Sequence, residues 1–325
     1  MSPKQELISL TVLGMAQTID DFNGDGLLDV YMIGMSSTTA RRIVALGIEH
    51  PDYPLESKLR SAMGYGNRML LSRGEKFITS PSADTVARTG WSWGTSSADF
   101  DNDRDRDLFV ANGHVSGESC RDYCTRFWSH DIFTNNSKNN PAFEQVFLGE
   151  LNSMIRRQTS WNGYEKNVLF LHDGKGDYLN AAYLLGVAHE FDSRAAASGD
   201  LNGDGLVDLV VVELDQKRRS EVVHLIKNTL STERNWTGVR LKPSPRGASL
   251  LGTKIFAIGP GHRQVSVIVA GDSFQAQHSP TAHFGLGDSI VERLEVHWPN
   301  GLVSRLSKPK LNTWIELTAP PIEKS

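Results

Sequence analysis

Short apolar runs alternate with polar turns along the first two thirds of the chain. The runs are rich in β-branched and aromatic residues, which is typical of buried strands. No apolar run is long enough to cross a bilayer as a helix. The predicted strands are residues 30–33, 67–71, 108–111, 131–135, 167–171, 209–212 and 223–228. The pattern therefore indicates an all-β fold.

Residues 7–16 form a further apolar run at the beginning of the chain. Ser9 and Thr11 interrupt it, and Glu6 replaces the positive flank that a secretory leader carries. We interpret this run as a strand, with a signal peptide as the alternative.

Three connections between the strands have helical signals instead. Residues 37–47 begin with a Ser-Thr cap and stop at Gly47, and residues 54–64 begin with Pro54 and end at a glycine. A third helix is predicted at 141–157. Such insertions on a β scaffold either contact partners or cover apolar strands.

Three polar turns share one pattern, at residues 21–29, 99–107 and 200–208. Each has an oxygen-bearing side chain at positions 1, 3, 5 and 9, and a carbonyl at position 7 can complete the shell. All-oxygen, mostly carboxylate sets suit Ca²⁺. The predicted side-chain ligands are Asp21, Asn23, Asp25 and Asp29; Asp99, Asp101, Asp103 and Asp107; and Asp200, Asn202, Asp204 and Asp208. The predicted carbonyl ligands are those of Leu27, Asp105 and Leu206.

Two other interpretations of these loops agree less well with the sequence. An EF-hand needs a Glu at position 12 and flanking helices, whereas position 12 here is Met32, Val110 or Val211 within a predicted strand. Asp, Asn and Gly are also common in plain turns, but carboxylates gathered in one turn repel each other unless a cation is present. Arg104 replaces the usual Gly at position 6, so we expect the second loop to be strained or differently shaped.

The charge distribution agrees with a metal-binding role for the loops. They contain 11 of the 38 acidic residues but only 2 of the 34 basic ones, so the rest of the chain is net positive. No basic block or basic amphipathic helix indicates nucleic-acid or membrane binding. Cys120 and Cys124 are too few for a disulfide framework, and a local disulfide and two free thiols both remain open.

The pattern changes near residue 230, after which strands follow closely and no acidic loop occurs. These strands are predicted at residues 237–242, 254–258, 264–269, 283–286, 293–298, 302–306 and 314–317. We predict two domains: residues 1–230 form a β-propeller, closed or partial, with helical insertions, and residues 236–318 form a small antiparallel β-sandwich-like domain.

The motifs resemble two known modules. The acidic loops are similar to the FG-GAP/VCBS repeats of integrin-like propellers. The tail resembles the ASPIC/UnbV domain, through Gly252-Thr253-Lys254-Ile255, Gly271-Asp272-Ser273-Phe274, His283-Phe284-Gly285-Leu286-Gly287 and Glu295-Val296-His297-Trp298-Pro299-Asn300-Gly301. This combination resembles the cartilage acidic protein-like family. The resemblance implies a secreted calcium-binding propeller without known catalysis.

Two motifs could suggest catalysis, but both are weak evidence for an active site. Gly90-Trp91-Ser92-Trp93-Gly94 fits the nucleophile elbow of hydrolases, but it leads into an acidic loop and not into a helix, so we expect it to begin a strand. Asp272, Ser273, His278 and His283 could suggest a catalytic triad, yet spacing does not fix their geometry.

The favoured hypothesis is an adhesion or protein-interaction module that binds up to three Ca²⁺ ions and an extracellular or periplasmic protein or glycan. Extracellular modules bind Ca²⁺ at about 10⁻⁴ to 10⁻³ M, so such loops fill outside the cytosol, and we expect a secreted, cell-surface or periplasmic protein. The alternatives are a calcium-dependent enzyme acting on an extracellular glycan or polymer, and a structural subunit of a larger assembly.

Overall fold

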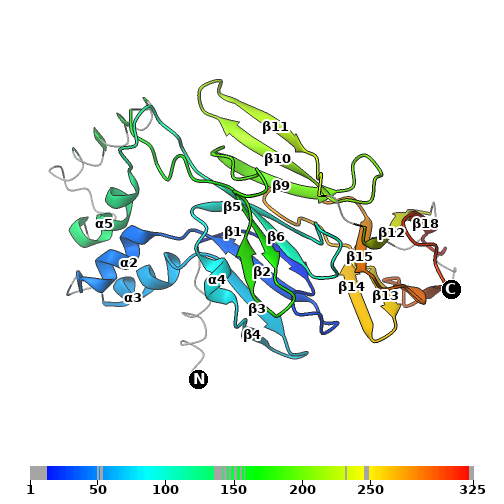
Figure 1. Ribbon diagram of the computed structural model, residues 1–325. Coiled ribbons are helices and arrows are strands. Elements are labelled where there is room, and N and C mark those ends of the chain that lie inside the picture. Colours follow the sequence, from blue (N-terminus) through cyan, green and yellow to red (C-terminus); the bar gives the residue numbers. More distant parts are fainter. Residues whose placement is uncertain are drawn as a thin grey trace.

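The computed structural model describes residues 13–49, 51, 54–134, 141, 145, 148–149, 152–153, 156, 158–230, 233–244 and 249–321. Among these residues the chain is mostly β, with antiparallel sheets in the centre of the molecule and helices at one end (Figure 1).

Three antiparallel sheets follow one another along the chain, and each begins with a strand that leads into an acidic loop (Figure 1). We call them blades 1, 2 and 3. Blade 1 contains β1 (Gly14–Asp20), β2 (Asp29–Gly34), β3 (Arg68–Ser72) and β4 (Phe77–Thr79). Blade 2 contains β5 (Ser92–Ala98), β6 (Asp107–Asn112), β7 (Val168–His172) and β8 (Tyr178–Asn180). Blade 3 contains β9 (Ser193–Gly199), β10 (Asp208–Asp215) and β11 (Ser220–Ile226).

Neighbouring blades pack face to face because each strand alternates its side chains between the two faces of its sheet. One apolar cluster joins blade 1 to blade 2, with Tyr31 and Met69 on one side and Leu108 and Phe170 on the other. A second cluster joins blade 2 to blade 3. This repeated arrangement confirms the predicted mostly β, propeller-like fold.

Most predicted strands are confirmed, but the one at 131–135 is wrong. Helix α5 (Cys124–Thr134) includes residues 131–134, and Asn135 lies outside the described residues. Cys124, Phe127 and Trp128 have helical spacing and pack on one apolar cluster, which selects a helix over the local strand preference. Of the strand predicted at 7–16, the described part overlaps β1, which continues to Asp20.

Two of the predicted helices are confirmed as α2 (Thr38–Ala45) and α3 (Pro54–Met63). The Ser37 hydroxyl caps α2 by accepting the Ala40 N–H at 3.1 Å. A short helix, α4 (Ala83–Ala87), precedes blade 2. The helix predicted at 141–157 falls largely outside the described residues. Helices α2, α3 and α5 lie together at the end of the molecule opposite the C-terminal domain (Figure 1).

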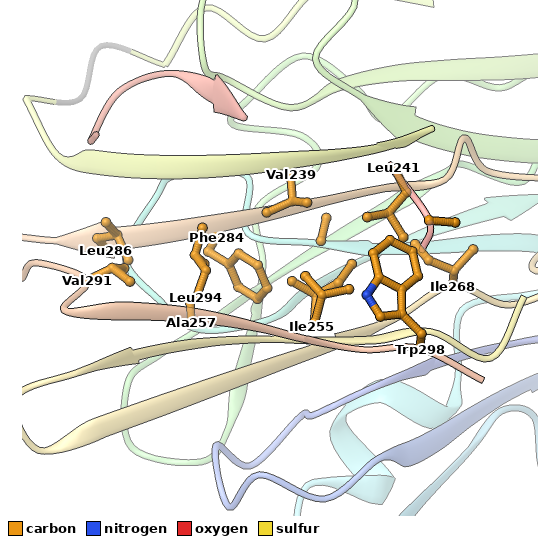
Figure 2. Packing of buried hydrophobic residues seen from close by; sticks show 13 residues of the cluster. Val239, Leu241, Ile255, Ala257, Ile268, Phe284, Leu286, Val291, Leu294 and Trp298 are labelled. Carbon is orange, nitrogen blue, oxygen red and sulfur yellow. The ribbon is translucent and has the colours of Figure 1, made fainter. Parts of the chain in front are cut away.

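The C-terminal part is a two-sheet sandwich. One sheet is ordered β15 (Thr281–Gly287), β12 (Asn235–Lys242), β18 (Trp314–Thr318). The other is ordered β14 (His262–Val267), β13 (Lys254–Gly259), β16 (Arg293–His297), β17 (Val303–Ser307). Figure 2 shows side chains from both sheets meeting in one core, among them Val239, Phe284, Ile255 and Leu294. β12 and β18 are parallel, the one departure from the predicted antiparallel pattern in this part of the described chain. The domain limits 1–230 and 236–318 stay a prediction.

A loop of this sandwich joins the first strands of all three blades. Ser273 donates its N–H to the Gln17 carbonyl of β1 at 3.1 Å. Its hydroxyl oxygen accepts the N–H groups of Thr95 in β5 at 3.1 Å and Ala196 in β9 at 3.4 Å. Ser273 is buried and has a positive φ of 70°. The sandwich therefore fixes the three blades relative to one another.

The sandwich also covers the acidic loops of blades 2 and 3. Gly287 donates its N–H to the Asn102 carbonyl at 2.8 Å in the second loop. In the third loop, the Trp314 indole N–H donates to Asp200 Oδ2 at 2.8 Å. Trp236 lies directly on Gly205, where an added Cβ would be only 2.1 Å from its indole nitrogen. The proposed metal loops are thus part of the contact between the blades and the sandwich.

Gly205 and Gly203 provide a matched pair that tests this contact. Both have positive φ, 88° and 78°, so replacement by Ala strains either backbone by about 1–2 kcal/mol. Only at Gly205 does the new methyl group meet Trp236, whereas nothing lies within 4 Å at Gly203. Gly205→Ala should therefore lower the thermal midpoint clearly more than Gly203→Ala, and equal losses would contradict the close contact.

Asp272 gives this junction a pH dependence. Burial raises the pKa of this carboxyl to about 7, against about 3.9 in an unfolded chain. Between these values the folded state binds more protons, so the contribution of Asp272 to stability is largest at low pH and falls as the pH rises toward 7. Each unit of pKa difference corresponds to about 1.4 kcal/mol.

Asp272→Asn should remove this pH dependence, because an amide does not ionise. The amide oxygen can still accept the Thr18 hydroxyl, which donates to Asp272 Oδ2 at 3.2 Å. The measurement is the thermal midpoint of both proteins between pH 5 and pH 8.5 in calcium-containing buffer. The thermal midpoint of the variant should rise relative to that of the parent as the pH increases. A difference between the two midpoints that does not change with pH would refute the raised pKa of Asp272.

Candidate metal centre

The three acidic loops share two internal hydrogen bonds. In each loop the first carboxylate accepts the backbone N–H groups of positions 5 and 6, and Asp200 also accepts that of Gly203. Asp99, for example, accepts the N–H groups of Asp103 at 2.9 Å and Arg104 at 2.8 Å. The equivalent bonds are made by Asp21 and Asp200. The backbone therefore curls around the first carboxylate in the same way three times.

The ninth carboxylate fastens each loop to the third strand of its blade. Asp107 accepts the N–H of Phe100, at position 2, and the N–H of His172, at the end of β7, both at 2.9 Å. Asp29 and Asp208 make the matching pairs, to Phe22 and Ser72 and to Leu201 and Asn228. These carboxylates thus have a structural role whether or not an ion is bound.

The second loop brings its carboxylates closest together. One oxygen from each of Asp99, Asp101 and Asp107 lies within 4.8 Å of the others. Asp101 Oδ1 is buried and has no hydrogen-bond partner. An unpaired buried carboxylate oxygen is costly, and this cluster of carboxylates could hold a metal ion.

Burial raises the pKa of several carboxyl groups in the first and second loops. Burial, opposed by the Arg106 guanidinium and a backbone N–H, raises the pKa of Asp99 to about 7. Burial also raises the pKa of Asp21 to about 6, and the carboxylates of Asp20 and Asp29 raise it further. The pKa of Asp107 is raised well above its usual range by burial and by Asp99. A divalent cation would offset this cost of ionisation.

Arg104 adopts the backbone conformation that glycine has at position 6 of the other two loops. Its φ is 90°, beside 83° for Gly26 and 88° for Gly205 at the same position of the other loops. Asn102 has a φ of 61° where those loops have Gly. Side-chain-bearing residues cost about 1–2 kcal/mol each in this region, so the loop is strained, and the contacts with the sandwich hold it.

The first and third loops are closer to solvent. Asn23 and Asn202 each accept the N–H of position 5, and each donates to the carboxylate there. Asp25 also pairs with Arg73 at 2.9 Å. The three carbonyl residues predicted as ligands, Leu27, Asp105 and Leu206, each donate their N–H to the fifth carboxylate of their loop. Among the described residues, only Asp99, Asp101 and Asp107 of the second loop bring three carboxylate oxygens within 4.8 Å of one another, and Asp103 is not part of this group. The ligand sets of the first and third loops stay a prediction.

A buried ion pair next to the loops was not predicted from the sequence. Arg106 Nε lies 3.1 Å from Asp20 Oδ1, and both side chains are about one tenth exposed. The pair joins the second loop to the end of β1, just before the first loop. Its partners are 86 positions apart along the chain, so no local pattern reveals it.

The polar side chains of the two motifs that could suggest catalysis make contacts within the fold. In the tail, the Ser273 hydroxyl accepts two backbone N–H groups, Asp272 Oδ2 lies 3.5 Å from His278 Nδ1, and His283 Nε2 lies 3.0 Å from the Gly205 carbonyl oxygen. Ser92 is fully buried at the start of β5, as expected, and its hydroxyl donates to Asn112 at 2.8 Å. Ser96 Oγ lies 3.0 Å from His278 Nε2. That nitrogen accepts the Ser198 N–H at 3.1 Å, so its lone pair cannot take the proton of Ser96, which is also fully buried.

Cys120 and Cys124 are free thiols. None of the described helices is long and apolar enough to span a bilayer.

Comparisons with known proteins match both parts of the chain. Residues 21–110 match the family model of the FG-GAP-like repeat, and residues 244–324 match that of ASPIC and UnbV. Cartilage acidic protein 1 of Mus musculus is 25% identical over 232 residues, which is 70% of this chain and 28% of the mouse protein. The Homo sapiens protein of the same name is 24% identical over 229 residues, which is 69% of this chain and 27% of that protein.

The chain thus spans little more than a quarter of the length of these relatives. Within that span, it carries an FG-GAP-like repeat followed by an ASPIC and UnbV domain, and it is similar to cartilage acidic protein 1.

Proposed function

We propose that this protein is a calcium-binding, extracytoplasmic protein-interaction module. The observation that carries the proposal is the second loop, where three carboxylates converge and Asp101 Oδ1 is buried without a partner. The oxygen-only donor set fits a hard cation such as Ca²⁺. The fifteen residues predicted from the sequence would hold up to three ions.

The ion would neutralise the carboxylates of each loop. The ninth carboxylates already bind two N–H groups each, so the ion adds to a loop that is partly organised without it. The sandwich rests on the second and third loops, through Gly287 and Trp314. Calcium would therefore stabilise the contact between the blades and the sandwich as well as each turn.

The proposed location outside the cytosol follows from the expected affinity of the loops for Ca²⁺. For a loop with Kd near 10⁻⁴ M, about 1 mM Ca²⁺ contributes about 1.4 kcal/mol, and cytosolic levels contribute almost nothing. The matched relatives are named for cartilage, which agrees with a role outside the cell. The match of residues 21–110 of this chain to the FG-GAP-like repeat supports a protein partner, in an adhesive or scaffolding contact.

Asp101→Ala tests the ligand role. Asp101 accepts no backbone N–H within its loop, and its ion pair with Arg234 at 2.9 Å is partly solvent-exposed. The substitution should therefore cost less than about 1 kcal/mol in EDTA. In calcium it should remove most of the stabilisation that the second loop gives. Thermal midpoints in EDTA and in 1 mM CaCl₂, together with calorimetric titration of Ca²⁺, measure both effects.

Asp107→Ala is the contrasting variant. It leaves two backbone N–H groups without an acceptor, at about 1–3 kcal/mol each, so it should destabilise the protein in EDTA as well as in calcium. If Asp101→Ala lost as much stability in EDTA as in calcium, or bound the same number of ions as the parent, the proposed metal site would be refuted.

A further inference from the structure

Among the residues that the structure describes, blade 3 has one strand fewer than its neighbours. Blades 1 and 2 each end with a short fourth strand, β4 and β8, that pairs with the third strand. In blade 3 the order is β11–β10–β9, and within the described part of the chain no strand pairs with the outer edge of β11. The backbone of this edge is a template for strand addition.

The ninth carboxylates define equivalent positions in the three blades. They bond the N–H groups of Ser72, His172 and Asn228. In blade 1 the residue paired with Ser72 is Phe77, and in blade 2 the residue paired with His172 is Tyr178. Both existing fourth strands therefore begin with an aromatic residue, and the corresponding place in blade 3 is beside Asn228.

The aromatic residue fills the space between its own blade and the preceding one. Tyr178 is 7% exposed and belongs to the core between blades 1 and 2, with Phe22, Leu108 and Phe170. Phe77 has no preceding blade among the described residues, and it is 52% exposed. A third aromatic residue would enter the interface between blades 2 and 3.

A cavity is present at that place. It has a volume of about 140 Å³ and is lined by Phe100, Leu209 and Ile226, which correspond to Phe22, Leu108 and Phe170, and by Leu185 and Asn228. An apolar cavity of about 150 Å³ holds a benzene ring. The cavity therefore matches the side chain that Tyr178 provides one blade earlier.

The exposure of side chains on the neighbouring blade 2 agrees with a missing fourth strand in blade 3. Ile78 and Leu179 occupy the same place in β4 and β8, since they pair with Leu71 and Leu171. Ile78, which faces a blade with four strands, is 37% exposed, whereas Leu179, which faces blade 3, is 62% exposed. An added fourth strand would cover Leu179.

Basic side chains along the edge of β11 indicate which residues the added strand carries. Lys227 takes the place of Leu171, so it would lie opposite the residue that follows the aromatic one. Its side chain is 62% exposed and its Nζ lies 3.4 Å from Asp204 Oδ2, so an acidic residue of the partner would share or replace this contact. A strand running antiparallel to β11 continues toward the exposed basic turn at residues 217–219. Acidic residues after the aromatic one would therefore complement this edge.

We propose that blade 3 binds an extended segment of a partner protein that adds a fourth strand to β11. An aromatic residue of this segment enters the cavity next to Asn228, and the acidic residue after it pairs with Lys227. The proposal deepens the protein-interaction role stated above by assigning its binding site. It does not require the acidic loops to bind calcium.

The chain's own fourth strand provides the probe. A fluorescent peptide with the sequence of residues 176–183, in which the residue corresponding to Leu179 is replaced by Glu, should bind the full-length protein and raise its anisotropy. Replacing the tyrosine of the peptide that corresponds to Tyr178 by Ala should weaken binding at least about tenfold. Replacing the Glu by Lys should weaken it by about two- to fivefold at low salt.

Two protein variants locate the site. Leu185 lines the cavity and is 36% exposed. Leu185→Trp places a larger side chain at the mouth of the cavity and should abolish peptide binding. Tyr183→Trp changes a nearby side chain that is 82% exposed and does not line the cavity, so its affinity should stay within about twofold of the parent's. Thermal midpoints verify that both variants are folded.

The peptide titrations are made in calcium and repeated in EDTA. Peptide binding is thus measured with and without calcium, and its failure can be distinguished from a failure of the loops to bind ions. Binding that Leu185→Trp abolishes and Tyr183→Trp preserves would support the proposal. It would be overturned by the absence of peptide binding at millimolar concentration, or by equal binding of the parent and Leu185→Trp. A dimer that Leu185→Trp dissociates would assign the edge to a second copy and would also overturn it.

Discussion

The structure depends on one repeated interaction, the carboxylate at the ninth position of each acidic loop. Asp29, Asp107 and Asp208 each hold the start of the loop and the end of the third strand through two backbone N–H groups. This places the other carboxylates of the loop around one point. The same bond sets the end of the third strand, where the fourth strand begins in blades 1 and 2.

Like charges gathered in this way must be offset. Some of the compensation comes from the protein, through the buried pair of Arg106 with Asp20 and through Arg234 beside the second loop. The sandwich adds neutral donors, such as the indole of Trp314 on Asp200. These groups leave Asp101 Oδ1 unpaired. The blades, the loops and the sandwich therefore meet beside a carboxylate cluster that could hold a metal ion.

Much of this arrangement was predictable from the sequence, because both the strands and the loops are local patterns. The spacing of Asp99, Asp101 and Asp107 predicted the turn, and the apolar runs predicted the strands, whereas the ligand set stays a prediction. The strand predicted at 131–135 failed because contacts of Phe127 and Trp128 with α2 decide that segment. Contacts between distant segments, such as Ser273 with three blades, leave no sequence signal. The same is true of the conformation of Arg104, which depends on its surroundings.

The most direct test of the central claim is anomalous diffraction from crystals grown with terbium, which replaces calcium in oxygen sites. We predict a peak within bonding distance of Asp99, Asp101 and Asp107, and further peaks in the loops at 21–29 and 200–208. Ordered loops without anomalous peaks in millimolar terbium would contradict the account.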